Sequence, residues 1–142
     1  MITPLRRAVL VLTVLIAAYV GIWAQFFPEA FYTSFPGVDL HWIDVDGAYN
    51  EHRIRDVGSL YLALGAASAA ALFVREVMVS RVVGLAWAVF GILHLAYHGM
   101  HLPSSPVDLA GNAVTLGGTA VCGIVLALPA RGRAEPAAPD TP

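Results

Sequence analysis

Four long apolar runs dominate the chain, at residues 8–27, 57–74, 82–100 and 109–128. Each run is close to the roughly 20 residues that an α-helix needs to cross a bilayer. Apolar residues follow one another within a run, without the in-and-out alternation of a transmembrane β-strand, and this excludes a β-barrel. The pattern predicts an all-α membrane protein: a four-transmembrane-helix bundle that forms one domain over residues 1–129.

The composition agrees with a chain that is solvated mainly by lipid. Of the 142 residues, 58% are hydrophobic and 13% are charged, whereas a soluble domain carries about 25% charged residues. The net charge of −2 argues against polyanionic partners, so we expect no binding to nucleic acid. The expected partners are the lipid bilayer and, within it, a second copy of the chain (a homodimer) or a membrane-complex partner.

The arginines predict the orientation of the bundle, because the chain contains no lysine. Only Arg53 and Arg55 lie on one side of the predicted spans. Six lie on the other side: Arg6, Arg7, Arg75, Arg81, Arg131 and Arg133. Under the positive-inside rule, both the N-terminus and the C-terminus are then cytoplasmic and residues 28–56 are extracytoplasmic. The sequence is rich in Ala, Gly and Val, and we expect a multi-pass protein of a bacterial cytoplasmic (inner) membrane.

The first apolar run has two interpretations, a signal peptide cut after Ala24 or a retained span. Trp23, Phe26 and Phe27 at its end are typical of the aromatic belt where a span leaves the membrane. This feature favours retention.

The segments outside the spans are of two kinds. Residues 28–56 are too many for a simple connection; Pro28 opens a short predicted helix, and Asn50 is a predicted N-cap of the second span. We therefore expect a long, ordered extracytoplasmic loop. Residues 130–142 are rich in proline and alanine and predict a disordered cytoplasmic tail.

Small residues predict where helices approach each other closely. Ala17 and Gly21 form such a pair in the first span. In the second span we expect a packing face of small residues: Ser59, Ala63, Ala67 and Ala71. The single cysteine, Cys122, has no partner for an intrachain disulfide and is expected to pack in the fourth span.

Three histidines interrupt the third apolar run. His94, His98 and His101 fall within about 60° of arc on a helix, and an imidazole at membrane depth has to face the bundle interior or water. We expect a polar pocket that opens outward. The histidines could simply form neutral hydrogen bonds, could hold a divalent metal between His94 and His98 at a spacing of four, or could conduct protons or a substrate.

A polar group precedes the second span. Glu51 with Arg55, and His52 with Asp56, are spaced to meet on one helix. Because the second and third spans are joined by a short turn, we expect at least one of these side chains to reach the histidine pocket. Glu51, His52 or Asp56 would supply the remaining ligands of a metal.

The stretch RDVGSLYLALG, residues 55–65, together with four spans and a histidine in the third, resembles small bacterial DoxX-like membrane proteins and related domains of unknown function. The resemblance implies a compact four-helix membrane fold and structural or binding importance for Arg55, Gly58 and Tyr61. DoxX relatives are associated with respiratory or redox-linked membrane complexes, but the wider group has no agreed activity.

The leading hypothesis is a non-enzymatic integral membrane protein, with no catalytic residue assigned, that binds a small ligand, ion or partner in the outward-facing pocket. The alternatives are a redox-accessory subunit or metal-dependent membrane enzyme, and a small transporter that acts as a dimer. The sequence leaves the cofactor unknown, with a divalent metal as the one candidate.

Overall fold

The computed structural model describes residues 1–37, 39–103 and 105–129. Within them, the fold consists of five α-helices. Four are long, α1 (Pro4–Phe26), α3 (Glu51–Val74), α4 (Val77–Met100) and α5 (Pro106–Ala127), and α2 (Pro28–Ser34) is short. The loop between α2 and α3 also contains the antiparallel strands β1 (Pro36–Gly37) and β2 (Leu40–His41) and the 3₁₀ turn η1 (Asp44–Asp46). The predicted helical bundle is confirmed, whereas the tail 130–142 lies outside the described residues.

The long helices begin before the apolar runs do. All four are long and apolar enough to cross a membrane. Three begin at a side chain that accepts a hydrogen bond from the first turn: Thr3, the predicted cap Asn50, and Ser105. The hydropathy pattern marks the part of a helix that suits lipid, but the caps set where the helix starts.

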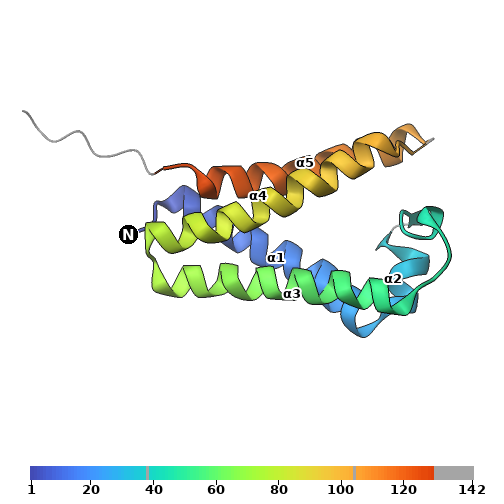
Figure 1. Cartoon of the computed structure of the whole chain (residues 1–142), viewed down its shortest axis with the longest axis horizontal. Coiled ribbons are helices and arrows are strands. Elements are labelled where there is room, and N and C mark those ends of the chain that lie inside the picture. Colours follow the sequence, from blue (N-terminus) through green and yellow to red (C-terminus); the bar gives the residue numbers. More distant parts are fainter. Residues whose placement is uncertain (38, 104, 130–142) are drawn as a thin grey trace, which may run out of the picture.

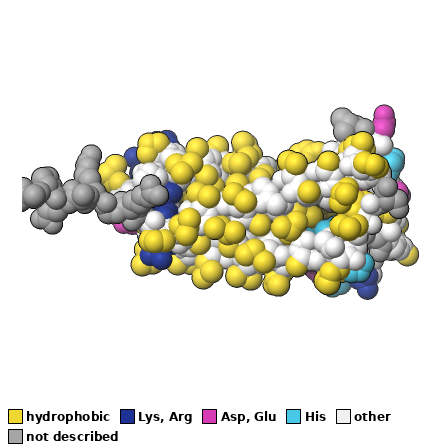
Figure 2. Space-filling view, turned by 90° about the horizontal axis from the view of Figure 1, so that it is seen from above, with side chains coloured by type: hydrophobic (Ala, Val, Ile, Leu, Met, Phe, Trp, Pro, Cys, Tyr) yellow, Lys and Arg dark blue, Asp and Glu magenta, His cyan; other side chains and the backbone are white. Residues whose placement is uncertain are grey.

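The four long helices form two antiparallel pairs, α1 with α3 and α4 with α5. The pairs meet at the end that holds the N-terminus and the α3–α4 turn, here named the terminal end, and diverge toward the opposite loop end (Figure 1). In the space-filling view of Figure 2, hydrophobic side chains cover the middle of the molecule, and histidines gather at the loop end.

Glycines allow the two helices of each pair to approach closely. A Cβ on Gly65 would lie 2.7 Å from the Cβ of Ala17, and one on Gly21 would lie 2.9 Å from Leu62, so the Ala17–Gly21 prediction is confirmed for α1 and α3. In the other pair, a Cβ on Gly123 would lie 2.6 Å from the carbonyl carbon of Trp87. Real Cβ atoms do not come this close, so only glycine permits these approaches.

The small-residue face predicted for the second span is right in its second half and wrong in its first: Ala71 is fully buried and Ala67 packs against the core. Ser59 and Ala63 are exposed, and the face of α3 that packs carries Gly58, Leu64 and Ser68. A Cβ on Gly58 would lie 2.5 Å from a backbone atom of α1, so the closest approach of the two helices is set by glycine rather than by the alanines.

Arg6 joins the two helix pairs at the terminal end. Its side chain is buried and donates hydrogen bonds to Ser80 Oγ at 3.0 Å, to the Leu126 carbonyl at 2.6 Å and to the Leu128 carbonyl. Carbonyl groups at the C-terminal end of a helix have no partner within the helix. A cation there also interacts favourably with the helix dipole, so Arg6 fixes the end of α5 to α1 and α4.

A buried polar cluster connects α1, α3 and α4. Ser68 Oγ donates to the Leu64 carbonyl at 2.9 Å and accepts from Trp87 Nε1 at 2.9 Å. The Thr13 hydroxyl oxygen lies 3.1 Å from Ser68 Oγ. Thr13, Ser68 and Trp87 are fully buried. The cluster therefore fixes the relative rotation of α1, α3 and α4.

We expect Ser68→Ala to lower the free energy of unfolding by about 1–3 kcal/mol, because the indole N–H of Trp87 would lose its acceptor inside an apolar core. Thermal denaturation of the detergent-purified protein measures this change. Ser59→Ala is the matched control, since the Ser59 side chain is exposed and its hydroxyl bonds only the side chain of Gln25. Equal melting temperatures for the two variants would contradict this account of the cluster.

Candidate ligand cavity

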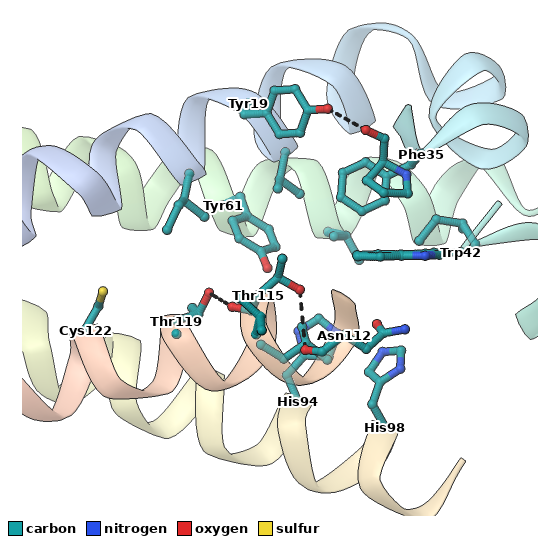
Figure 3. Close-up of a pocket in the computed structure, with 18 of the residues that line it drawn as sticks. Tyr19, Phe35, Trp42, Tyr61, His94, His98, Asn112, Thr115, Thr119 and Cys122 are labelled. Atoms are coloured by element: carbon teal, nitrogen blue, oxygen red, sulfur yellow. Dashed lines mark hydrogen bonds between the residues drawn. The ribbon is translucent and has the colours of Figure 1, made fainter. Parts of the chain in front are cut away.

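A cavity of about 380 Å³ lies where the two helix pairs diverge (Figure 3). All four long helices and the loop contribute to its wall. Most of the side chains that line it are apolar, among them Leu12, Ile16, Val20, Val57 and Leu116. The polar side chains in the wall come mainly from α3, α4 and α5, namely Tyr61, His94, His98, Asn112, Thr115 and Thr119.

Tyr61 forms part of the wall in the middle of the cavity, between Cys122 and Trp42 (Figure 3). Its ring contacts Trp87 at 6.0 Å and Phe90 at 5.2 Å between centroids, both edge to face. The residue is only 5% exposed, and its hydroxyl points across the cavity toward Thr115 on α5 (Figure 3). Within the described part of the chain, this hydroxyl makes no hydrogen bond. The aromatic contacts thus orient the Tyr61 hydroxyl toward the cavity.

The α5 side of the cavity is polar, but most of its donors are already used within the helix. Thr115 Oγ1 donates to the Gly111 carbonyl at 2.8 Å, and Thr119 Oγ1 donates to the Thr115 carbonyl at 2.8 Å. Asn112 donates one amide hydrogen to the Asp108 carbonyl at 3.0 Å. These bonds satisfy the side chains without a partner on another helix.

The three predicted pocket histidines of α4 lie at two different cavities. His94 and His98 line the cavity between the helix pairs, with ring centroids 4.9 Å apart. His101 does not; its ring stacks on Tyr97 at 4.3 Å, and it lines a second cavity of about 570 Å³ at the loop end. His98 borders both cavities. His94 and His98 thus lie at a cavity whose wall is mostly apolar, while His101 lies farther along the helix.

Trp42, which the sequence pattern did not single out, lines both cavities, as His98 and Asn112 do. It lies at the outer end of the first cavity (Figure 3). Its Nε1 donates to Asp108 Oδ1 at 2.8 Å, so the loop is tied to the first turn of α5. A Cβ on Gly111 would lie 2.6 Å from the indole, which shows how closely the ring lies on α5. The predicted ordered loop therefore covers the cavity.

The polar group at the start of α3 lies elsewhere. Its predicted pairs are present: Arg55 Nε lies 2.8 Å from Glu51 Oε1, and His52 Nε2 lies 3.4 Å from Asp56 Oδ2. Arg55 also donates to the Gln25 carbonyl on α1. None of the four residues is among those that line either cavity, so the expected contribution to the histidine pocket is not found. The reason is that the helix pairs diverge at this end, and the first turns of α3 lie beside α1 instead.

For the same reason, the further ligands expected for a metal at His94 and His98 do not lie near these two histidines. The ligands were expected from Glu51, His52 or Asp56, which lie outside the cavity. Among residues 1–37, 39–103 and 105–129, no group of three or more His, Cys, Asp or Glu side chains is arranged to hold a metal ion. Two imidazoles alone supply half of a tetrahedral site.

No protein-family model, curated protein or solved structure matches this chain.

Proposed function

We propose that this chain is a multi-pass membrane protein that binds a small, mainly apolar molecule in the cavity between its helix pairs. The observation that carries the proposal is the cavity: about 380 Å³ of space between the two helix pairs, within the range of roughly 300–1,000 Å³ that ligand pockets occupy. At about 30 Å³ for each water-sized group, it has room for about a dozen such groups.

The apolar wall and the polar side chains have different consequences for such a ligand. A molecule dissolved in the bilayer gains little from an apolar wall, because lipid tails are as apolar as leucine. Its preference for the cavity has to come from shape and from the polar groups, which include Tyr61 and Asn112. The proposed ligand is therefore an apolar molecule with a polar function at one position.

The orientation of the cavity is part of the proposal. The described arginines at the terminal end, Arg6, Arg7, Arg75 and Arg81, outnumber Arg53 and Arg55 at the loop end. The positive-inside rule favours a cytoplasmic terminal end. The cavity would then lie in the extracytoplasmic half of the bundle, beneath the loop.

Two neighbouring glycines of α5 provide a matched test. Gly118 lines the cavity, whereas Gly117 does not, and a Cβ on either would meet no atom within 4 Å. We expect Gly118→Phe to place its ring in the cavity and to abolish retention of the ligand. Gly117→Phe should retain it, although both variants gain the same side chain on the same helix.

Mass spectrometry of an organic extract from each purified protein measures retention. The parent and Gly117→Phe should carry one compound in near-stoichiometric amount, and Gly118→Phe should lack it. If all three proteins carry the same set of compounds in the same amounts, the cavity is not the binding site.

A further inference from the structure

We infer that the ligand is a lipophilic carbonyl compound, and that the Tyr61 hydroxyl donates a hydrogen bond to its carbonyl oxygen. This inference rests on the proposed function, since it names the chemistry of the molecule that would occupy the cavity. It is carried by the position of Tyr61, by the hydrogen-bond state of the other polar groups in the wall, and by the size of the cavity.

Four of the other donors that face the cavity are engaged within the protein, whereas His98, which also lines it, makes ring contacts with His94 and Tyr97. The indole N–H of Trp42 donates to Asp108, and the hydroxyls of Thr115 and Thr119 donate within α5. The Tyr19 hydroxyl donates to the Pro36 carbonyl at 2.8 Å. Tyr61 differs from these four donors, because its hydroxyl has no hydrogen-bond partner among the described residues.

The burial of the Tyr61 ring makes the missing hydrogen-bond partner of its hydroxyl significant. The residue is 5% exposed, and its ring packs against Trp87 and Phe90, so the hydroxyl is directed into the cavity. A hydroxyl that leaves water without a compensating hydrogen bond is costly. A ligand atom that accepts from it removes that cost, and a ligand without such an atom does not.

The kind of acceptor follows from the surroundings. A phenol hydroxyl has a single hydrogen to donate, and the wall beside it is mostly apolar. An ionised acceptor would be expensive to place there, whereas a neutral carbonyl accepts a hydrogen bond and otherwise dissolves in the bilayer. Asn112 has given only one of its two amide hydrogens to Asp108, so the α5 side offers a second donor.

The probe for the test is 2-undecanone labelled with ¹³C at the carbonyl, compared with undecane. Both have about a dozen heavy atoms, which matches the capacity estimated from roughly 30 Å³ for each group. The two molecules differ only in the carbonyl oxygen. Each is added to the full-length protein in lipid nanodiscs, as the parent, as Tyr61→Phe, and as Tyr97→Phe. Tyr97 is exposed and lines neither cavity, so its variant controls for the loss of a phenol oxygen.

We expect the parent and Tyr97→Phe to bind the ketone about three- to tenfold more tightly than Tyr61→Phe does, as for one hydrogen bond. Undecane should bind all three proteins equally. Isotope-edited infrared spectra should show the bound ¹³C=O stretch at lower frequency than in protein-free nanodiscs, and Tyr61→Phe should remove this shift.

Other outcomes separate the inference from the proposed function. If ketone and alkane bind all three proteins with the same affinity and without an infrared shift, the carbonyl inference is overturned, but the cavity remains a binding site. If neither compound binds the parent saturably, both the inference and the proposed function are overturned. Thermal melts of the three proteins establish that a loss of binding does not reflect unfolding.

Discussion

Gly123→Phe is expected to separate α4 from α5 and to cause the largest loss of stability of any single change considered for this protein. Even a single added carbon at Gly123 would lie 2.6 Å from the Trp87 carbonyl carbon and 2.7 Å from the Ala88 Cα. Overpacking a core costs about 1–3 kcal/mol when side chains can move aside. Backbone atoms of a helix cannot do so, and we therefore expect a loss at the upper end of that range or beyond.

Thermal denaturation in detergent, followed by circular dichroism, measures the effect. Gly117→Phe on the same helix is the control, because no atom lies within 4 Å of the position that its Cβ would take. A Gly123→Phe protein that melts at the same temperature as Gly117→Phe would show that α4 and α5 do not pack as described.

Arg6→Leu is the second large effect that we expect. The change would leave the Ser80 hydroxyl and the carbonyls of Leu126 and Leu128 without the guanidinium that now donates to them. Hydrogen bonds to charged groups contribute about 1.5–3 kcal/mol each, and part of this loss would be recovered by water at the terminal end. We expect a net decrease of about 3 kcal/mol in the free energy of unfolding.

The neighbouring residue offers a direct comparison. Arg7 is exposed, so Arg7→Leu removes the same charge from the same turn and should change stability by less than about 0.5 kcal/mol. Arg6→Lys should fall between the two, because a single ammonium cannot reproduce the fork of the guanidinium. If Arg6→Leu and Arg7→Leu are equally stable, Arg6 acts only as a surface charge.

The elements were predictable because their signals are local. Long apolar runs identify helices that suit a membrane, and Asn50 is a capping residue whose side chain accepts a hydrogen bond in the structure. The rotation of α3 was not predictable in the same way. Small residues lie on more than one face of this helix, and the sequence alone did not distinguish Gly58 and Gly65, which touch α1, from Ala63, which is exposed.

The candidate site was predicted in part. An imidazole is costly to expose to lipid, and on this principle His94 and His98 were expected to face a pocket; both line the cavity between the helix pairs. The error at Glu51 and Asp56 came from the assumption that consecutive spans pack along their whole length. Trp42 was missed because its place depends on the path of the loop, and its contact with Asp108 joins segments 66 residues apart.

Photo-crosslinking with a diazirine-bearing alkyl ketone tests the central claim, a ligand site between the helix pairs, most directly. The account predicts saturable adducts on residues that line the cavity, such as Val57, Thr115 and Cys122, and their disappearance in Gly118→Phe but not in Gly117→Phe. Adducts confined to exposed apolar positions outside the cavity lining, such as Leu15 and Leu93, and unchanged in both variants, would contradict it.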